Sequence, residues 1–117
     1  MFNSGAGVRL GAEQVSAAGV GNSIRGNSIY VNDGLGISLS DGGGIKSTPL
    51  PNDTLDPDTG ANNRQNYPVL VAPTQSGGMT TVTGTLNSLA STTFNIDFYV
   101  SENQDSSGYG EGQTYVD

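Results

Sequence analysis

The sequence predicts an all-β chain in which the last coils of a β-solenoid are followed by a partial antiparallel β-sandwich. Between residues 21 and 39, Asn recurs at every fifth position, and Ile24 and Ile29 keep the same step. The three positions are Asn22, Asn27 and Asn32. A period of five fits neither a helix nor a two-sided strand, but it suits short strands that turn at each corner of a coil. After residue 66, runs of β-branched and aromatic residues alternate with turn signals, which is typical of an antiparallel sheet.

The first strands are expected on successive coils, because residues 7–10 (Gly-Val-Arg-Leu) match residues 36–39 (Gly-Ile-Ser-Leu) at an offset of 29. A coil of about 20–30 residues is normal for solenoid repeats. Since side chains alternate along a strand, the aliphatic side chains are expected to face inward, with Arg9 and Ser38 facing outward. The residues expected to line this narrow core are Val8, Leu10, Ile24, Ile29, Ile37 and Leu39.

The composition of the chain changes between residues 41 and 66, where Pro49, Pro51 and Pro57 interrupt any regular secondary structure. The sequence therefore predicts three parts. They are solenoid coils at 1–45, an acidic Asn/Asp/Pro-rich junction loop at 46–66 and the partial β-sandwich at 67–117.

Strands of the third part are expected at residues 67–72, 79–86 and 93–100, with a last strand from about Gln113. Gly77-Gly78 is expected to join the first two. The alternation is clearest in the strand at 93–100, which places apolar side chains on an inner face and polar ones on an outer face. The inner set is Phe94, Ile96, Phe98 and Val100, and the outer set is Asn95, Asp97 and Tyr99. A sandwich usually has about seven strands, so this half is expected to be truncated.

Charge and composition exclude several functions. The chain has 117 residues, of which 11 are acidic and 4 basic, giving a formal net charge of −7. Because phosphate binding requires a basic face, nucleic acids and anionic membranes are not expected as partners. The absence of Cys and His excludes zinc sites, thiol catalysis and a Ser-His-Asp triad within the chain. No apolar run reaches the roughly 20 residues that span a membrane, so no membrane insertion is expected.

The junction loop holds the one local cluster of metal-ligand residues. Asp56, Asp58, Gly60 and Asn62 follow the D-x-D-x-G-x-N spacing of a calcium loop, and Asp53 offers a further carboxylate. Alternate residues of such a loop point their oxygens inward, and Gly permits the bend. The match is partial, because an EF-hand loop ends on a bidentate Glu at a position that Tyr67 occupies here. The candidate Ca²⁺ ligands are Asp53, Asp56, Asp58 and Asn62, and the alternative is a surface turn whose side chains cap their own backbone.

No catalytic residues can be assigned. Glu13, Asp33 and Asp41 are candidates for paired carboxylates acting on a glycosidic bond, but their spacing gives no geometric pair. Arg25 is a candidate base of the lyase type, and the alternative is an outward, solvated side chain. Five tyrosines can stack on sugar rings or pack on strands; they are Tyr30, Tyr67, Tyr99, Tyr109 and Tyr115. Whether the parent protein is an enzyme stays open, with a non-enzyme favoured.

Five segments together carry a resemblance to a known family. They are residues 22–39, 52–70, 84–88, 94–99 and 108–115. In this order they resemble the last coils of right-handed parallel β-helix repeat proteins, of the pectin lyase-like class found among bacterial surface and exported proteins, followed by the β-sandwich module attached to them. Ser38 departs from the pattern, since the family commonly has Asp in Gly-Ile-Asp-Leu.

The resemblance implies a piece of a longer secreted or cell-surface protein. The implied function is that of a non-catalytic structural or adhesive module, with a polysaccharide or other cell-surface ligand as its partner. The alternative is the C-terminal part of a carbohydrate-active β-helix enzyme, such as a polysaccharide lyase or a glycoside hydrolase. Asp and Arg/Lys clusters on one face of the neighbouring coils would favour the enzyme. None of the catalytic residues of related lyases maps onto a position of this chain.

Overall fold

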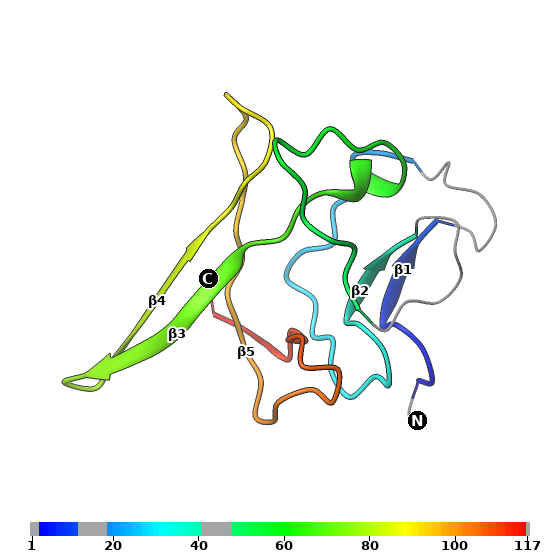
Figure 1. The fold of residues 1–117 in the computed structure, drawn as a ribbon. Helices are drawn as coiled ribbons and strands as arrows, with labels where there is room; N and C mark the ends of the chain where they lie inside the picture. The colour runs from blue at the N-terminus through cyan, green and yellow to red at the C-terminus, as the bar shows by residue number, and fades with distance from the viewer. Residues whose placement is uncertain (1–2, 12–18, 41–47, 117) are drawn as a thin grey trace.

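The computed structural model describes residues 3–11, 19–40 and 48–116, which form a mostly β structure (Figure 1). The elements are β1 (Val8–Leu10), β2 (Ile37–Leu39), a single 3₁₀ turn η1 (Ala61–Arg64), β3 (Val69–Ser76), β4 (Met79–Thr85), β5 (Tyr99–Val100) and β6 (Thr114–Tyr115). They pair into three two-stranded sheets, so the β-rich class that the sequence predicts is confirmed. Within the described ranges, no helix is long and apolar enough to cross a membrane.

The first sheet joins β1 and β2 in parallel at the offset that the sequence repeat predicts. Val8 pairs with Ile37, Arg9 with Ser38 and Leu10 with Leu39. An isolated bridge between Asn3 and Asn32 extends this register. The backbone N–H of Val8 donates to Gly36 O at 2.9 Å, and Ser40 N–H donates to Leu10 O at 2.8 Å. The predicted pairing is confirmed, although the described residues contain only this one parallel pair and no multi-rung β-helix.

The predicted faces of β2 are wrong. Ser38 is only 4% exposed, whereas Ile37 is 43% exposed. The backbone on either side is buried at Gly34, Gly36 and Ser40, so the space behind β2 is too narrow for a large side chain. The outward place of Arg9 is not found either, because Arg9 is partly buried. The other five residues of the predicted core are partly buried; they are Val8, Leu10, Ile24, Ile29 and Leu39.

The second sheet is the antiparallel hairpin of β3 and β4, which extends away from the parallel pair (Figure 1). Gly77 and Gly78 form its turn with φ of 58° and 77°, a conformation that favours glycine and that the sequence predicts at this place. Pro73 lies inside β3, where the register shifts between Val71 and Thr74. Every residue of both strands is exposed.

The third sheet is shorter than predicted, and the faces of residues 96–100 are the reverse of those predicted, whereas Phe94 is partly buried and Asn95 is exposed, as predicted. Only Tyr99 and Val100 of the segment at 93–100 pair, with Thr114 and Tyr115. The rings of Tyr99 and Tyr115 meet edge to face, with centroids 5.5 Å apart. Asp97 and Tyr99 are partly buried, while three apolar side chains predicted to face inward are exposed; they are Ile96, Phe98 and Val100. The reason is that Asp97 and Tyr99 bind the segment that contains Arg25, as described next.

Candidate functional site

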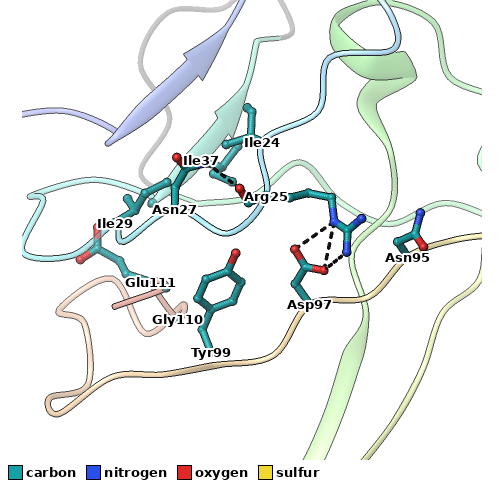
Figure 2. A pocket seen from close by; sticks show the side chains of 12 residues that line it. Ile24, Arg25, Asn27, Ile29, Ile37, Asn95, Asp97, Tyr99, Gly110 and Glu111 are labelled. Carbon is teal, nitrogen blue, oxygen red and sulfur yellow. Dashed lines mark hydrogen bonds and ion pairs between the residues drawn. The ribbon is translucent and has the colours of Figure 1, made fainter. Parts of the chain in front are cut away.

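A cavity of about 480 Å³ separates the Asn-rich segment at 22–32 from the C-terminal segment at 95–112 (Figure 2). Ile24, Ile29 and Ile37 supply its apolar wall. Its polar lining comes from both sides of the gap and consists of Arg25, Asn27, Asn95, Asp97, Tyr99 and Glu111. The cavity therefore has an aliphatic wall on one side with amide, carboxylate and phenol groups around it.

Three hydrogen bonds, each with a main-chain donor or acceptor, hold the two sides of this cavity together. Gly26 N–H donates to the Tyr99 hydroxyl at 2.8 Å, and Ile29 N–H donates to Gly112 O at 2.7 Å. The Ser28 hydroxyl donates to Gln113 O at 2.5 Å. Gly26 has a φ of 65°, a left-handed conformation that turns its N–H toward Tyr99 at little steric cost. The rim therefore depends on one bond between main-chain atoms and on two bonds that use the hydroxyl groups of Tyr99 and Ser28.

Arg25 and Asp97 form an ion pair at one end of the cavity (Figure 2). Arg25 Nε lies 3.0 Å from both Oδ1 and Oδ2 of Asp97, and Nη2 also bonds Oδ1. The guanidinium hydrogen bonds and charge lower the pKa of Asp97, and the carboxylate in turn raises the pKa of Arg25. The side chain of Asp97 is 11% exposed and that of Arg25 is 50% exposed. Both groups therefore stay charged at neutral pH.

Glu111 is held at the other end of the cavity by Asn32. The Asn32 side-chain amide donates to Glu111 Oε1 at 2.7 Å, and the Asn32 backbone N–H donates to Oε2 at 3.3 Å. Asn32 Oδ1 also accepts a hydrogen bond from the Asn3 amide at 3.3 Å. The amide of Asn32 thus connects the Asn3–Asn32 bridge to a carboxylate of the cavity.

This arrangement suits binding better than acid–base catalysis. A general acid at neutral pH needs a raised pKa, whereas the pKa of Asp97 is lowered by Arg25. Arg25 is tied to the same carboxylate and is not placed to abstract a proton. Amide, carboxylate and phenol groups around an aliphatic wall are groups that orient a small polar ligand.

A second cavity of about 670 Å³ adjoins the first and shares six lining residues with it, which are Ile24, Arg25, Gly36, Ile37, Asn95 and Gly110. Its further lining includes three aromatic side chains, which are Tyr67, Phe94 and Tyr109. Of the five tyrosines that the sequence singles out, Tyr99 lines the first cavity, and Tyr67 and Tyr109 line the second. Together the two cavities make a continuous hollow along the interface between the two segments.

Two of the candidate calcium ligands, Asp56 and Asn62, form hydrogen bonds with other residues of the chain. Asp56 is buried, where its Oδ1 accepts Asn66 N–H at 3.2 Å and its Oδ2 accepts the Ser88 hydroxyl. Asn62 pairs with the backbone of Asn22: its Oδ1 accepts Asn22 N–H at 2.9 Å, and its amide donates to Asn22 O at 2.8 Å. These two predicted ligands therefore already have hydrogen-bond partners within the chain.

Asp53 and Asp58 complete the predicted set. Asp53 is tied through its backbone to the Asn66 side chain, at 3.1 and 2.7 Å. Its Oδ1 is buried and accepts no hydrogen bond from the described residues. Asp58 is partly buried. In the part of the chain that the structure describes, no three acidic side chains gather closely enough to hold a metal ion.

Sequence reasoning found little of the cavity. It weighed Arg25 as a lyase-type base or a solvated residue and placed Asn95 and Asp97 on an outer face, and it did not single out Glu111. The ion pair joins residues 72 positions apart, and no local motif signals a contact at such a distance. Of the carboxylates weighed for catalysis, Asp33 is exposed, and Glu13 and Asp41 lie outside the described residues.

Comparison of the chain with known protein families, with curated proteins and with solved structures finds no match. Its function is therefore inferred from the residues and contacts described above.

Proposed function

We propose that this chain is a non-catalytic structural or adhesive module of a secreted or cell-surface protein, and that its cavity takes a saccharide. The observation that carries the proposal is the hollow between residues 22–32 and 95–112, with Asn, Asp, Arg, Glu and Tyr side chains around an aliphatic wall. Ligand cavities commonly measure about 300–1,000 Å³ and orient their ligand through a few convergent polar groups. A volume of about 480 Å³ falls within that range.

The finer fold belongs to the same proposal. We assign residues 1–45 to the terminal coils of a right-handed parallel β-helix and residues 67–117 to an attached β-sandwich module of a longer exported protein. The parallel register of β1 and β2 at an offset of 29 supports stacked coils. The Asn3–Asn32 side-chain hydrogen bond at the same offset supports them as well, because stacked Asn side chains bond along such a ladder.

The charges of the cavity favour a neutral sugar. Asp97 neutralises Arg25, and Glu111 adds a second carboxylate, which Asn32 binds. In the first cavity a uronate would therefore meet a net negative lining whose one cation among the described residues, Arg25, is already bound to Asp97, and like charges disfavour such binding. The enzyme alternative is a polysaccharide lyase or a glycoside hydrolase. Because a polysaccharide lyase acts on acidic polymers, a preference for neutral sugars distinguishes the proposed module from the lyase.

Binding to neutral and acidic oligosaccharides tests the proposal. Titration calorimetry with neutral hexose oligomers should give saturable binding, and the matching uronate oligomers should bind more weakly. Asn95→Ala and Asn27→Ala should each weaken binding by up to about tenfold, the loss of one net hydrogen bond. Asn103→Ala, an exposed position outside the cavity lining, is the matched control and should bind as the native chain does. If no oligosaccharide binds saturably, the saccharide proposal is wrong.

Ca²⁺ at the junction loop is a separate proposal, with Asp53, Asp56, Asp58 and Asn62 as ligands. The buried Oδ1 of Asp53 supports it, because this oxygen accepts no hydrogen bond from the described residues. Ca²⁺ sites of extracellular modules bind at about 10⁻⁴–10⁻³ M. Millimolar Ca²⁺ should therefore raise the melting temperature over that in EDTA, and Asp58→Ala should remove the increase. Equal melting temperatures in Ca²⁺ and EDTA would exclude the site.

A further inference from the structure

The outer edge of β4 is a row of backbone donors and acceptors with nothing paired to it. β4 bonds only β3, and no other backbone hydrogen bond of the described residues reaches Met79–Thr85. The two-residue turn makes Ser76 and Met79 a hydrogen-bonded pair, so alternate residues of β4 point their backbone groups at β3. The residues left with N–H and C=O groups pointing outward are Thr80, Val82 and Gly84.

The two edges of the hairpin differ in how they are protected. Natural proteins guard open edges with proline, bulges and charges. β3 has Pro73, which lacks an N–H, and the register shift beside it. β4 has no proline, no shift and no charged residue. Only the edge of β4 can therefore accept a regular strand along its whole length.

The charge of the chain indicates which partner fits this edge. The protein has a net charge of −7, yet residues 65–96 contain no Asp, Glu, Lys or Arg. Two copies of an acidic chain repel each other through most surfaces. They meet without like-charge contact at this stretch, whereas nothing in it offers a counter-charge to a basic partner.

We infer that β4 pairs antiparallel with β4 of a second copy, giving a continuous four-stranded sheet across a two-fold axis. The axis passes at Val82, so Val82 lies beside its own counterpart, Thr81 faces Thr83 and Thr80 faces Gly84 of the other copy. Cross-strand Thr–Thr pairs are favourable. An isolated two-stranded hairpin is marginally stable in water, while three or more strands with an apolar face hold together. The contact is independent of the saccharide cavity and of its ligand.

Charge reversal at the two-fold axis tests this pairing. Sedimentation velocity from micromolar to millimolar concentration should show the native chain in a monomer–dimer equilibrium. Val82→Lys and Val82→Glu should each weaken association by about tenfold or more, because like charges are then carried by directly opposed side chains, whose Cβ atoms lie roughly 5 Å apart across the axis. An equimolar mixture of the two variants should restore a dimer. Val71→Lys, the same change at an exposed valine on β3, is the control and should leave the dimer intact.

Hydrogen exchange gives a second readout that needs no variant. The amides of Thr80, Val82 and Gly84 should become protected as the concentration rises, while those of Thr81 and Thr83 are protected at every concentration by β3. A native chain that stays monomeric at millimolar concentration overturns the inference. Open-ended growth beyond the dimer overturns it as well. The inference is also wrong if a mixture of the two Val82 variants fails to associate, or if protection that rises with concentration does not include these three amides.

Discussion

Single side chains decide which face of a segment is covered in this protein. Asp97 would face solvent by the alternation of apolar residues around it, yet it binds Arg25 and draws Tyr99 to the same side. The Arg25–Asp97 ion pair and the hydrogen bond from Gly26 N–H to Tyr99 outweigh the burial of Ile96 and Phe98 here. The reason is that no second layer of the described residues covers these two side chains. Hydrophobic alternation therefore predicts a strand face correctly only where a layer exists to pack against it.

The Arg25–Asp97 pair should make stability depend on pH. The pKa of Asp97 is lowered from its ordinary value of 3.8 by the Arg25 guanidinium, so the unfolded chain takes up a proton at higher pH than the folded chain. The contribution is present above the ordinary pKa and is lost as pH falls through the lowered one. Denaturant melts of the native chain below pH 4 should lose stability more steeply than those of Asp97→Asn. Parallel pH profiles of the two would contradict the role of the pair.

Asp56 should contribute to stability through the hydrogen bonds it accepts. Asp56→Ala leaves Asn66 N–H and the Ser88 hydroxyl without their acceptor in a buried place. The cost is about 1–3 kcal/mol of unfolding free energy. Asp58→Ala removes the neighbouring carboxylate, which makes no such contacts, and should change stability by less than about 0.5 kcal/mol. Urea melts in EDTA measure both values, and equal losses for the two variants would contradict this assignment.

At the scale of elements, pairing was predictable and orientation was not. The repeat at an offset of 29 predicts the register of β1 with β2, and Gly77-Gly78 predicts the turn between β3 and β4. Both signals are local or repetitive. The burial of Ser38, which lies within β2, depends on how closely other parts of the chain approach the backbone at Gly34 and Gly36. The composition of the sequence does not reveal this approach.

The candidate site was largely beyond prediction for a related reason. Its contacts join residues between 72 and 85 positions apart, as with Arg25 and Asp97 or Ser28 and Gln113. Each residue alone sits in an ordinary polar turn or strand. Only the packing of the Asn-rich segment against the C-terminal segment turns them into one cavity, and single-sequence patterns carry no information on that packing.

Gly7 tests the close approach of the segment before β1 to the segment before β2. A Cβ at this position would lie 2.5 Å from Ile29 Cγ2 and 2.9 Å from Gly36 O. Gly7→Ala should therefore destabilise the protein by about 1–3 kcal/mol, as overpacking does elsewhere. At Gly5 the nearest atom to an added Cβ is 4.0 Å away, so Gly5→Ala is the matched control and should cost little. Thermal melts that show the same small change for both variants would mean that the two segments are not in close contact at Gly7.

At the scale of the whole molecule, the structure is thin and has little buried apolar surface. Its extents are 49 × 42 × 21 Å, and among the described residues only Leu35 and Ala61 form a fully buried apolar core. A small core provides little of the usual driving force for folding. The polar contacts between residues 25–32 and the C-terminal segment are therefore expected to hold the two halves together as one cooperative unit.

Asn32 is the best place to test that cooperativity, because it contacts both halves. Its amide group bonds Asn3, which precedes β1, and Glu111, which precedes β6. Asn32→Ala should lower the unfolding free energy by about 1–3 kcal/mol, since Glu111 and Asn3 lose a partly buried partner. Amide exchange in β1–β2 and in β5–β6 should accelerate by the same factor if the halves open together. Asn103→Ala, an exposed asparagine, should leave both rates unchanged. Acceleration confined to one sheet would show that the halves unfold independently.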